Sequence, residues 1–476
     1  MTDRYRIIQQ TAWCGHQCDF IRNASVMDDK RFVMKDTETL RKKMFRLMLP
    51  MAFQQFMLAL VGACDAVMLG KLNQDSMAAV SLASQVTFVF NLFVAAFIIG
   101  ENMFVAQYFG KKDFAGISKV CSLVLRTSLV TAVIFMTASI LFPENIMRFL
   151  TNEADLIVLG SEYLRWVGVS WLLSAVSQVY LTFMKNCGAV NLSTVISSTT
   201  VILNIVLNAV LIFGLAGFPA MGVSGAALAT VTATAVQTVW CTVYVTVRRR
   251  ELEIHLLERD AGLGKRFWDK TAPVLLNELL WGGGFTMYSV VMGHLGTDAV
   301  AANSIANISK NLVVCFCYGL GGAGSIIVGN ELGADRFEEA KKYGRTLVKA
   351  SVLCGAVTGL LLLSLSPLIV RMVDLTPGAG EYLKWMLVMC SYYLAGKSIN
   401  CMTIGGIFPA GGDSRFGMVC DGVTLWCITV PLGCLCAFVF KLPVLMVYFV
   451  LNLDEIVKLP VVYRHYRKYG WVKNIT

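Results

Sequence analysis

Three ionisable residues lie inside long apolar stretches of this 476-residue chain, where a charge is costly unless it has a function or a partner. Asp65 lies in LVGACDAVMLG, Glu278 in VLLNELLWGGG and Lys397 in SYYLAGKSINC. A carboxylate at such a depth can take up a proton or bind Na⁺, and a lysine there can neutralise an acid when no cation is bound. The three residues therefore indicate ion-coupled transport.

Each of these residues also has a purely structural interpretation. Asp65 could be an acid near the membrane interface that is hydrogen-bonded for packing, and Glu278 an acid favoured by the dipole near a helix start. Lys397 could extend its ammonium group to the interface or form a fixed pair. Asp454 and Lys458 are four residues apart, a spacing that favours a pair along one helix.

The composition identifies the kind of protein that holds these residues. Hydrophobic residues make up 56% of the chain and charged residues only 15%, against about 25% charged residues in soluble domains. The net charge of +10 lies in short loops between apolar runs, whereas a nucleic-acid-binding protein gathers such an excess on one face. We therefore predict a polytopic membrane protein, with no nucleic acid among its partners and no enzymatic activity.

Apolar segments long enough to cross a membrane recur along the whole chain. At a rise of about 1.5 Å per residue, each can span a hydrocarbon core of about 30 Å as a helix. They lack the period-two alternation of barrel strands, so the predicted fold class is all-α. The twelve predicted transmembrane helices are 44–69, 77–108, 117–142, 158–184, 190–216, 221–247, 271–293, 301–329, 344–370, 381–409, 416–440 and 443–463.

The two halves of the chain repeat one another. The stretch DAVMLGKLNQDSMAAVSLA, which starts at Asp65, returns 223 positions later as YSVVMGHLGTDAVAANSIA, which starts at Tyr288. Gly110 likewise returns as Gly333. Six spans separate matching points, so the two six-helix repeats are parallel and are expected to form two lobes around a central cleft. The repeat is asymmetric where it matters, because tyrosine replaces the acid at position 288.

Lys and Arg residues set the expected orientation, with both termini and the central loop in the cytoplasm. The predicted divisions are a cytoplasmic arm 1–43, an N-lobe 44–247, a basic linker 248–270, a C-lobe 271–463 and a cytoplasmic tail 464–476. In the arm, Cys14, His16 and Cys18 lack the further ligands of a metal site. No metal site is expected, except that Asp65 could bind Na⁺.

The candidate site residues fall into two groups. Gln55 shares a helix face with Asp65 and is the repeat counterpart of Glu278, so the predicted cation or proton coupling residues are Asp65, Glu278, Gln55 and Lys397. Polar stripes and aromatic side chains could line the cleft, although the stripes could equally serve as hydrogen bonds between helices. The predicted cleft residues are Asn204, Asn208, Gln237, Trp281, Phe285, Tyr288, Tyr392 and Tyr393.

As a set, several stretches resemble the MATE (multidrug and toxic compound extrusion) family, in its bacterial type. They include MLPMAFQQFMLALVGACDAVMLGKL, AQYFGKKDF, APVLLNELLWGG and GIFPAGGDSRFGMVCDG. The resemblance implies two six-helix lobes and export driven by inward Na⁺ or H⁺. It places Asp65 at the family's cation-linked aspartate of the first helix and Glu278 in the NEL motif of one branch. Trp281 stands where another branch has its acid, so the coupling ion stays open.

Together these features predict a secondary active antiporter of the inner membrane. It would export amphipathic, cationic organic compounds in exchange for Na⁺ or H⁺ by alternating access, as a monomer in contact with membrane lipid and with no cofactor besides the coupling ion. One alternative is a flippase for lipid-linked oligosaccharides or lipids from the same superfamily. An alternative of another class is a channel or a non-transporting membrane receptor.

Overall fold

The computed structural model describes residues 40–249, 252, 254–256, 260–373 and 375–476. It divides into a unit of residues 1–45 and a compact unit of residues 46–476, and the second unit contains nearly all of the described residues. All but the last four residues of the predicted arm 1–43, including Cys14, His16 and Cys18, lie outside the described residues, as do parts of the predicted linker.

Each predicted span of the first half coincides with one continuous helix, and these helices form the N-lobe. The loops are short and two of them hold small extra elements, α5 (Pro143–Leu150) and η1 (Leu215–Gly217). The six long helices are α2 (Leu40–Leu72), α3 (Gln74–Lys111), α4 (Phe114–Leu141), α6 (Ala154–Asn186), α7 (Val190–Phe213) and α8 (Gly222–Arg248).

The C-lobe begins with four long helices and ends in broken ones. The long helices are α9 (Ala261–Gly293), α10 (Thr297–Gly333), α11 (Phe337–Met372) and α12 (Pro377–Met402). The predicted span 381–409 continues from α12 through the short π-helix η2 (Thr403–Ile407) into α13 (Phe408–Ala410). The span 416–440 contains two more π-helical segments. Its elements are α14 (Ser414–Gly422), η3 (Val423–Thr429), α15 (Val430–Cys434) and η4 (Leu435–Val439).

The last predicted span, 443–463, is not a continuous helix. It consists of α16 (Val444–Leu451), α17 (Asp454–Val457) and α18 (Leu459–Arg467), and Pro460 stands in the first turn of α18. Nine helices in the described part of the chain are long and apolar enough to cross a membrane. The three remaining predicted spans, around α9, α12 and α16–α18, are those that hold Glu278, Lys397 and Glu455. The predicted all-α fold with two six-helix lobes is confirmed.

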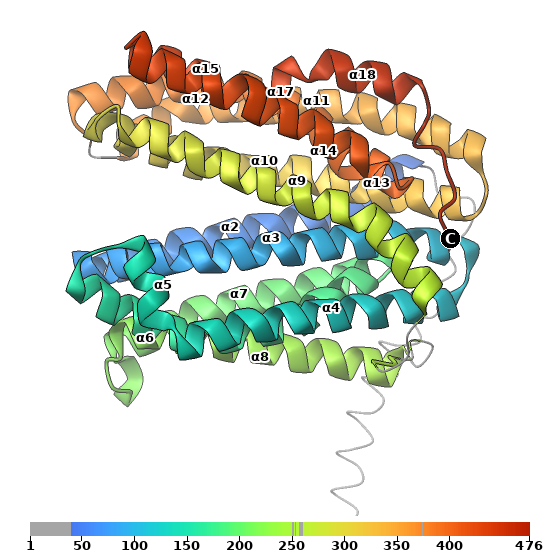
Figure 1. Ribbon diagram of the computed structural model, residues 1–476, viewed down its shortest axis with the longest axis horizontal. Helices are drawn as coiled ribbons and strands as arrows, with labels where there is room; N and C mark the ends of the chain where they lie inside the picture. Colours follow the sequence, from blue (N-terminus) through green and yellow to red (C-terminus); the bar gives the residue numbers. More distant parts are fainter. Residues whose placement is uncertain (1–39, 250–251, 253, 257–259, 374) are drawn as a thin grey trace, which may run out of the picture. The chain divides into compact units, whose positions relative to one another are not determined.

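Figure 1 shows the two lobes of the 46–476 unit as two bundles, one with α3 to α8 and one with α9 to α18. The seam between them is closest where α3 meets α10. The backbone of Gly110 lies against the carbonyl of Asn330, and that of Gly333 against the carbonyl of Gln107, so tightly that a Cβ atom would clash at either glycine. Since Gly110 and Gly333 are repeat counterparts, the seam itself has two-fold pseudo-symmetry. Asn102 Nδ2 also donates to Ser325 Oγ across it at 2.8 Å.

The C-terminal residues tie the two lobes at the same end. Gln107 Nε2, on α3, donates to the carbonyls of Ala410 at 2.7 Å and Lys473 at 3.0 Å, and Ile475 N donates to Gln107 Oε1 at 2.8 Å. Trp471 is fully buried, and its ring stacks on Tyr466 at 5.7 Å. The tail therefore packs as part of the C-lobe and also bonds to the N-lobe.

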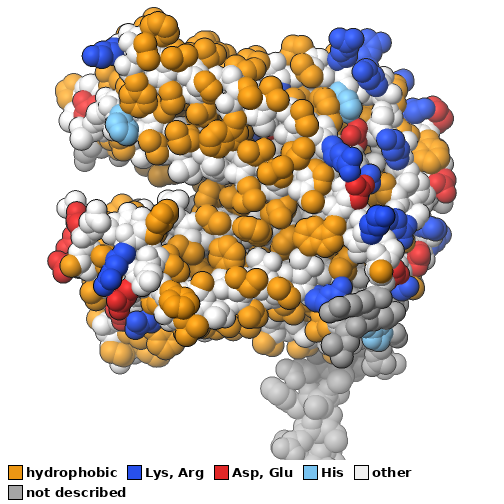
Figure 2. Space-filling model, viewed as in Figure 1, with side chains coloured by type: hydrophobic (Ala, Val, Ile, Leu, Met, Phe, Trp, Pro, Cys, Tyr) orange, Lys and Arg blue, Asp and Glu red, His pale blue; other side chains and the backbone are white. Residues whose placement is uncertain are grey.

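The two ends of the 46–476 unit differ in charge and in closure. In Figure 2 most of the visible Lys and Arg residues gather at the right-hand end, where the seam lies, and we call this the basic end. At the opposite end an open notch separates the two lobes. The lobes are therefore joined at the basic end and apart at the other.

Candidate functional site

A central cavity of about 490 Å³ lies between the two lobes, towards the basic end. Its walls come from α2, α3 and α6 of the N-lobe and from α9, α10, α12 and α14 of the C-lobe. Gln55 and Glu278, which occupy equivalent positions in the two repeats, both line it. The pseudo-symmetry of the chain thus places a neutral amide on one wall of the cavity and an acid on another.

The Glu278 carboxylate is half-buried and forms no hydrogen bond or ion pair with any described residue. The three glycines that follow it allow α9 to pack closely against its neighbours. A Cβ atom at Gly282 would lie 2.5 Å from the side chain of Leu92, and one at Gly283 would lie 3.0 Å from Trp426. Glu278 is therefore an acid on a tightly packed helix, with its carboxylate open to the cavity.

Asp65 heads a chain of neutral polar groups inside the N-lobe. Asn208 Nδ2, on α7, donates to Asp65 Oδ1 at 2.6 Å and to Asn204 Oδ1 at 3.2 Å. Asn204 Nδ2 in turn donates to Thr230 Oγ1 on α8 at 3.3 Å. The Oδ1 atom of Asn208 is buried without a partner. Among the described residues the carboxylate therefore has one donor, the neutral amide of Asn208, and carboxylate and amide oxygens of this kind are ligands of hard cations.

Gln237 lies apart from this chain. Its Nε2 donates to Ser177 Oγ on α6 at 2.9 Å, and the nearby Thr238 Oγ1 donates to the carbonyl of Leu173 at 2.9 Å. Gln237 lines neither the central cavity nor the smaller cavity of the C-lobe. The sequence allowed the polar residues of α8 either to line the cleft or to form hydrogen bonds between helices. At Gln237 and Thr238 the structure has the hydrogen bonds.

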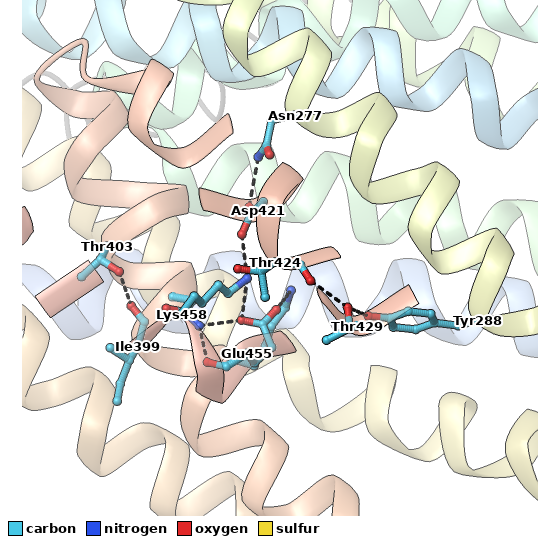
Figure 3. A network of polar contacts seen from close by, with 11 residues as sticks. Asn277, Tyr288, Ile399, Thr403, Asp421, Thr424, Thr429, Glu455 and Lys458 are labelled. Atoms are coloured by element: carbon cyan, nitrogen blue, oxygen red, sulfur yellow. Dashed lines mark hydrogen bonds and ion pairs between the residues drawn. The ribbon is translucent and has the colours of Figure 1, made fainter. Parts of the chain in front are cut away.

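A network of compensated charges occupies the C-lobe beside the central cavity (Figure 3). Lys458 Nζ lies 2.7 Å from Asp421 Oδ1 and 3.1 Å from Glu455 Oε2, and Asn277 Nδ2 donates to Asp421 Oδ2 at 3.3 Å. Glu455 also accepts from Lys397 Nζ at 3.0 Å. All of these side chains except Asn277 and Lys397 are more than 90% buried.

The structure bears on two residues of this network whose partners the sequence considered. Lys397 pairs with Glu455, which is one of the alternatives that the sequence left open, and its ammonium also lies over the rings of Trp281 at 5.6 Å and Tyr318 at 5.8 Å. The predicted pair between Asp454 and Lys458 is wrong. Because the last span is broken into α16, α17 and α18, Lys458 turns towards Glu455 and Asp421 instead.

The predicted aromatic residues divide between two places. Trp281 and Phe285 stack with ring centroids 5.9 Å apart, and both line a second cavity of about 200 Å³, together with Tyr288 and Tyr393. This cavity is lined mainly by the C-lobe, and Phe88 on α3 of the N-lobe also contributes to it. The Tyr288 hydroxyl is hydrogen-bonded to Thr429 Oγ1 at 2.8 Å. Tyr392 lines neither cavity, and its ring packs on Phe449 at 5.8 Å.

Sequence reasoning missed several ionisable residues that the structure places at these cavities. Asp421, which bonds to Lys458, lines the central cavity together with Lys185. Lys310 lines the smaller one. Asp421 and Lys310 lie inside the predicted spans 416–440 and 301–329. The depth criterion that singled out Asp65 would have identified both.

Comparison with known proteins places the chain among related sequences. The MatE family model matches residues 50–210 and 273–435, which are the two repeats. A probable multidrug resistance protein NorM of Rhizobium meliloti is 27% identical over 404 residues, covering 80% of this chain and 83% of that protein. A probable multidrug resistance protein YoeA of Bacillus subtilis is 26% identical over 415 residues, covering 85% of this chain and 88% of that protein.

Solved structures share the fold. One is an outward-facing conformation of a multidrug resistance MATE family transporter, with a TM-score of 0.81 and 19% identity, covering 90% of this chain and 96% of that one. Another is a transporter of the MOP superfamily from Pyrococcus furiosus, with a TM-score of 0.81 and 19% identity, covering 90% of this chain and 95% of that one.

Proposed function

This chain belongs to the MATE family, and we propose that it is a secondary active antiporter that exports amphipathic, cationic organic compounds in exchange for Na⁺ or H⁺. The observation that carries the proposal is Asp65, a half-buried carboxylate whose only bonded partner among the described residues is the neutral amide of Asn208. No base of the described residues forms an ion pair with it, so binding of a cation or a proton would change the net charge of the N-lobe interior.

The ion would bind at the end of the lobes where the notch is open. Asp65 lies seven residues before the end of α2, on the side away from the basic end, and the unpartnered Oδ1 of Asn208 supplies a second oxygen next to the carboxylate. By the positive-inside rule the basic end is cytoplasmic, so the notch faces outward. Ion binding at Asp65 from outside would then favour one arrangement of the lobes over the other, which is the requirement for coupling.

The substrate would bind in the central cavity. The unpaired carboxylate of Glu278 supplies negative charge, and the indole of Trp281 supplies an apolar face that also attracts cations. At about 490 Å³ the cavity lies in the range of sites for drug-sized molecules. Alternating access requires the seam at Gly110 and Gly333 to open, because it closes the cytoplasmic route in this arrangement.

The test is efflux of a fluorescent organic cation from proteoliposomes under an imposed Na⁺ gradient or an imposed pH gradient. We expect one gradient to drive efflux and Asp65→Asn to abolish the drive while the protein still inserts. Asp155→Asn, which alters an exposed acid at the start of α6, is the matched control and should transport normally. Gradient-driven efflux by a fully inserted Asp65→Asn protein would refute the proposal.

A flippase for lipid-linked oligosaccharides is the second candidate, and one observation favours it. Three lysines, Lys185, Lys397 and Lys458, line the central cavity, and such charges suit an anionic headgroup. Two of them are already compensated by Glu455 and Asp421. If neither gradient drives efflux of the organic cation, transfer of a fluorescent anionic lipid between leaflets becomes the assay that decides.

A further inference from the structure

The smaller cavity of the C-lobe holds two charges that the proposed mechanism does not use. It has a volume of about 200 Å³ and lies between α9, α10, α12, η3 and the α16–α17 region, with Phe88 of α3 at its edge. Trp281, Tyr318 and Lys397 line both this cavity and the central one, so they form the wall between the two. The charges in question are those of Lys310 and Asp454, and both residues line the smaller cavity.

Lys310 lines the cavity from α10 and has no acid of the described residues within ion-pair distance. Its ammonium lies over the ring of Tyr393, 4.8 Å from the centroid, and it forms no ion pair with any described residue. Asn303 and Asn307 precede it by seven and three positions on the same helix face, and both line the cavity. A cation flanked by amide side chains on one wall is an arrangement that binds an anionic group such as a carboxylate.

Asp454 lies on another wall and is equally unpaired. It is only 4% exposed, its Oδ1 atom has no hydrogen-bond partner, and it forms no ion pair with any described residue. The nearby lysines form ion pairs with other acids. Lys397 pairs with Glu455, and Lys458 pairs with both Glu455 and Asp421. A buried carboxylate without a partner is costly, so a cationic group that enters the cavity would be stabilised there.

The two charges share one cavity but do not pair with each other. The space between them is bounded by aromatic rings, including those of Phe285 and Tyr288. Its volume corresponds to about six or seven water molecules at ~30 Å³ each, enough for a small ring with short polar arms. We propose that this cavity binds a small aromatic zwitterion, with its anionic group at Lys310, its ammonium group at Asp454 and its ring among the aromatic side chains.

This site is distinct from the central cavity, and its occupancy is measurable without any ion gradient. The experiment is isothermal titration of the purified full chain in detergent with L-tryptophan, tryptamine and indole-3-propionate. The three probes share the indole ring and carry both charges, only the cation and only the anion, respectively. We expect L-tryptophan to bind at least about tenfold more tightly than either analogue. Equal affinity for all three, or no binding of L-tryptophan at millimolar concentration, would overturn the proposal.

Variants assign each charge to its residue. Lys310→Met should remove the preference of the protein for L-tryptophan over tryptamine, and Asp454→Asn its preference over indole-3-propionate. Lys310→Arg should keep both preferences, which separates loss of charge from loss of fold. Lys384→Met, which removes another lysine that lies over an aromatic ring but outside the cavity, is the matched control and should bind all three probes unchanged. Retention of both preferences in Lys310→Met and Asp454→Asn would refute the assignment.

Because these titrations are independent of transport, they also separate this proposal from the proposed antiport. An Asp65→Asn protein that has lost coupled efflux should still prefer L-tryptophan, since Asp65 lies in the other lobe and does not line the cavity. Loss of that preference in Asp65→Asn would contradict a zwitterion site built by Lys310 and Asp454 alone.

Discussion

The first and fifth spans of each lobe make the same contact with different chemistry. In the N-lobe Asn208 donates to Asp65 at 2.6 Å, and these residues are 143 positions apart. In the C-lobe the hydroxyls of Tyr288 and Thr429 meet at 2.8 Å, 141 positions apart, and Tyr288 is the repeat counterpart of Asp65. The fold thus keeps a polar contact at this place in both lobes, while only the N-lobe puts an acid in it.

A second contact between the same spans, nearer the basic end, shows the reverse. In the N-lobe Gln54 Nε2 donates to Ser197 Oγ at 2.7 Å. In the C-lobe Asn277, the counterpart of Gln54, donates to Asp421 at 3.3 Å. The acid therefore lies at the open end of one lobe and towards the basic end of the other. The two lobes thus share the positions of both contacts, but the acid stands at a different one in each lobe.

Asp421 and Asp65 differ in position, but they differ more in whether a basic side chain pairs with them. Asp421 has Lys458 within 2.7 Å, and Lys458 is shared with Glu455, which in turn holds Lys397. Among the described residues, Asp65 is bonded only to the amide of Asn208. A buried acid with fixed counter-charges favours the arrangement that keeps those pairs together, whereas an acid with a neutral donor has room for a cation or a proton as its partner. The comparison supports the proposals that the C-lobe network has a structural role and that the coupling ion binds at Asp65.

The largest effect is expected at the centre of the C-lobe network. Glu455→Gln removes the acid that Lys397 and Lys458 share and leaves uncompensated buried charge, at a cost of about 3–5 kcal/mol in the free energy of unfolding. Denaturant titration in mixed micelles measures it. Glu338→Gln breaks a surface pair with Lys341 and is the matched control, with an expected loss below about 1 kcal/mol. If Glu455→Gln is as stable as the wild type, the C-lobe network does not have the structural role proposed for it.

Coupling between Lys458 and Asp421 gives the next effect. Lys458→Met alone should be strongly destabilising, because it leaves Asp421 buried without its counter-charge. Adding Asp421→Asn removes that charge and should restore about 1–3 kcal/mol of the loss. The measurement is a double-mutant cycle on the same unfolding titration. Strict additivity of the two substitutions would show that the pair does not couple.

The acid of the N-lobe should matter little for stability. Asp65→Asn keeps an oxygen that can accept from Asn208, so we expect a change of about 1 kcal/mol or less in the free energy of unfolding. The same preparation that fails in coupled efflux should therefore unfold like the wild type. A loss of stability as large as that of Glu455→Gln would contradict the distinction between the two lobes.

The smallest effect is expected at the neutral counterpart of Asp65. Tyr288→Phe removes one hydroxyl from the contact with Thr429, which keeps its own hydrogen bond to the carbonyl of Thr424 at 3.0 Å. Interhelical hydrogen bonds in membranes average about 0.6 kcal/mol, and we expect a loss of that size. Gradient-driven efflux by Tyr288→Phe should stay coupled. If efflux by Tyr288→Phe no longer responds to the gradient, the contact between Tyr288 and Thr429 has a coupling role like the one proposed for Asp65.

Much of the frame could be predicted because it depends on local properties of the chain. Long apolar runs predict spans, and the fixed offset between halves predicts two equivalent lobes. The recurrence of Gly110 as Gly333 is explained by the seam, where each glycine meets a backbone carbonyl of the other lobe. Each of these predictions uses only the hydropathy of one segment or its similarity to the matching segment of the other half.

The partners themselves could not be predicted. Lys458 was expected to bond to Asp454, four residues away, yet it bonds to Glu455 and to Asp421, which is 37 positions distant. Helix periodicity assumes a continuous helix, and here the span is broken between α16 and α18. Gln237 and Tyr392 carry side chains suited to a cleft, but the rotation of their helices directs them to Ser177 and Phe449.

By itself the sequence determined the membrane setting, the duplicated six-helix lobes and the depth of Asp65, Glu278 and Lys397, because hydropathy and repeats are written along the chain. Only the tertiary structure decided which charges are compensated. Compensation depends on the distance between side chains of different helices, and that distance is set by helix packing, by the π-helical segments of the C-lobe and by the broken last span. The same packing left Lys310 and Asp454 without an ion pair among the described residues, in one cavity.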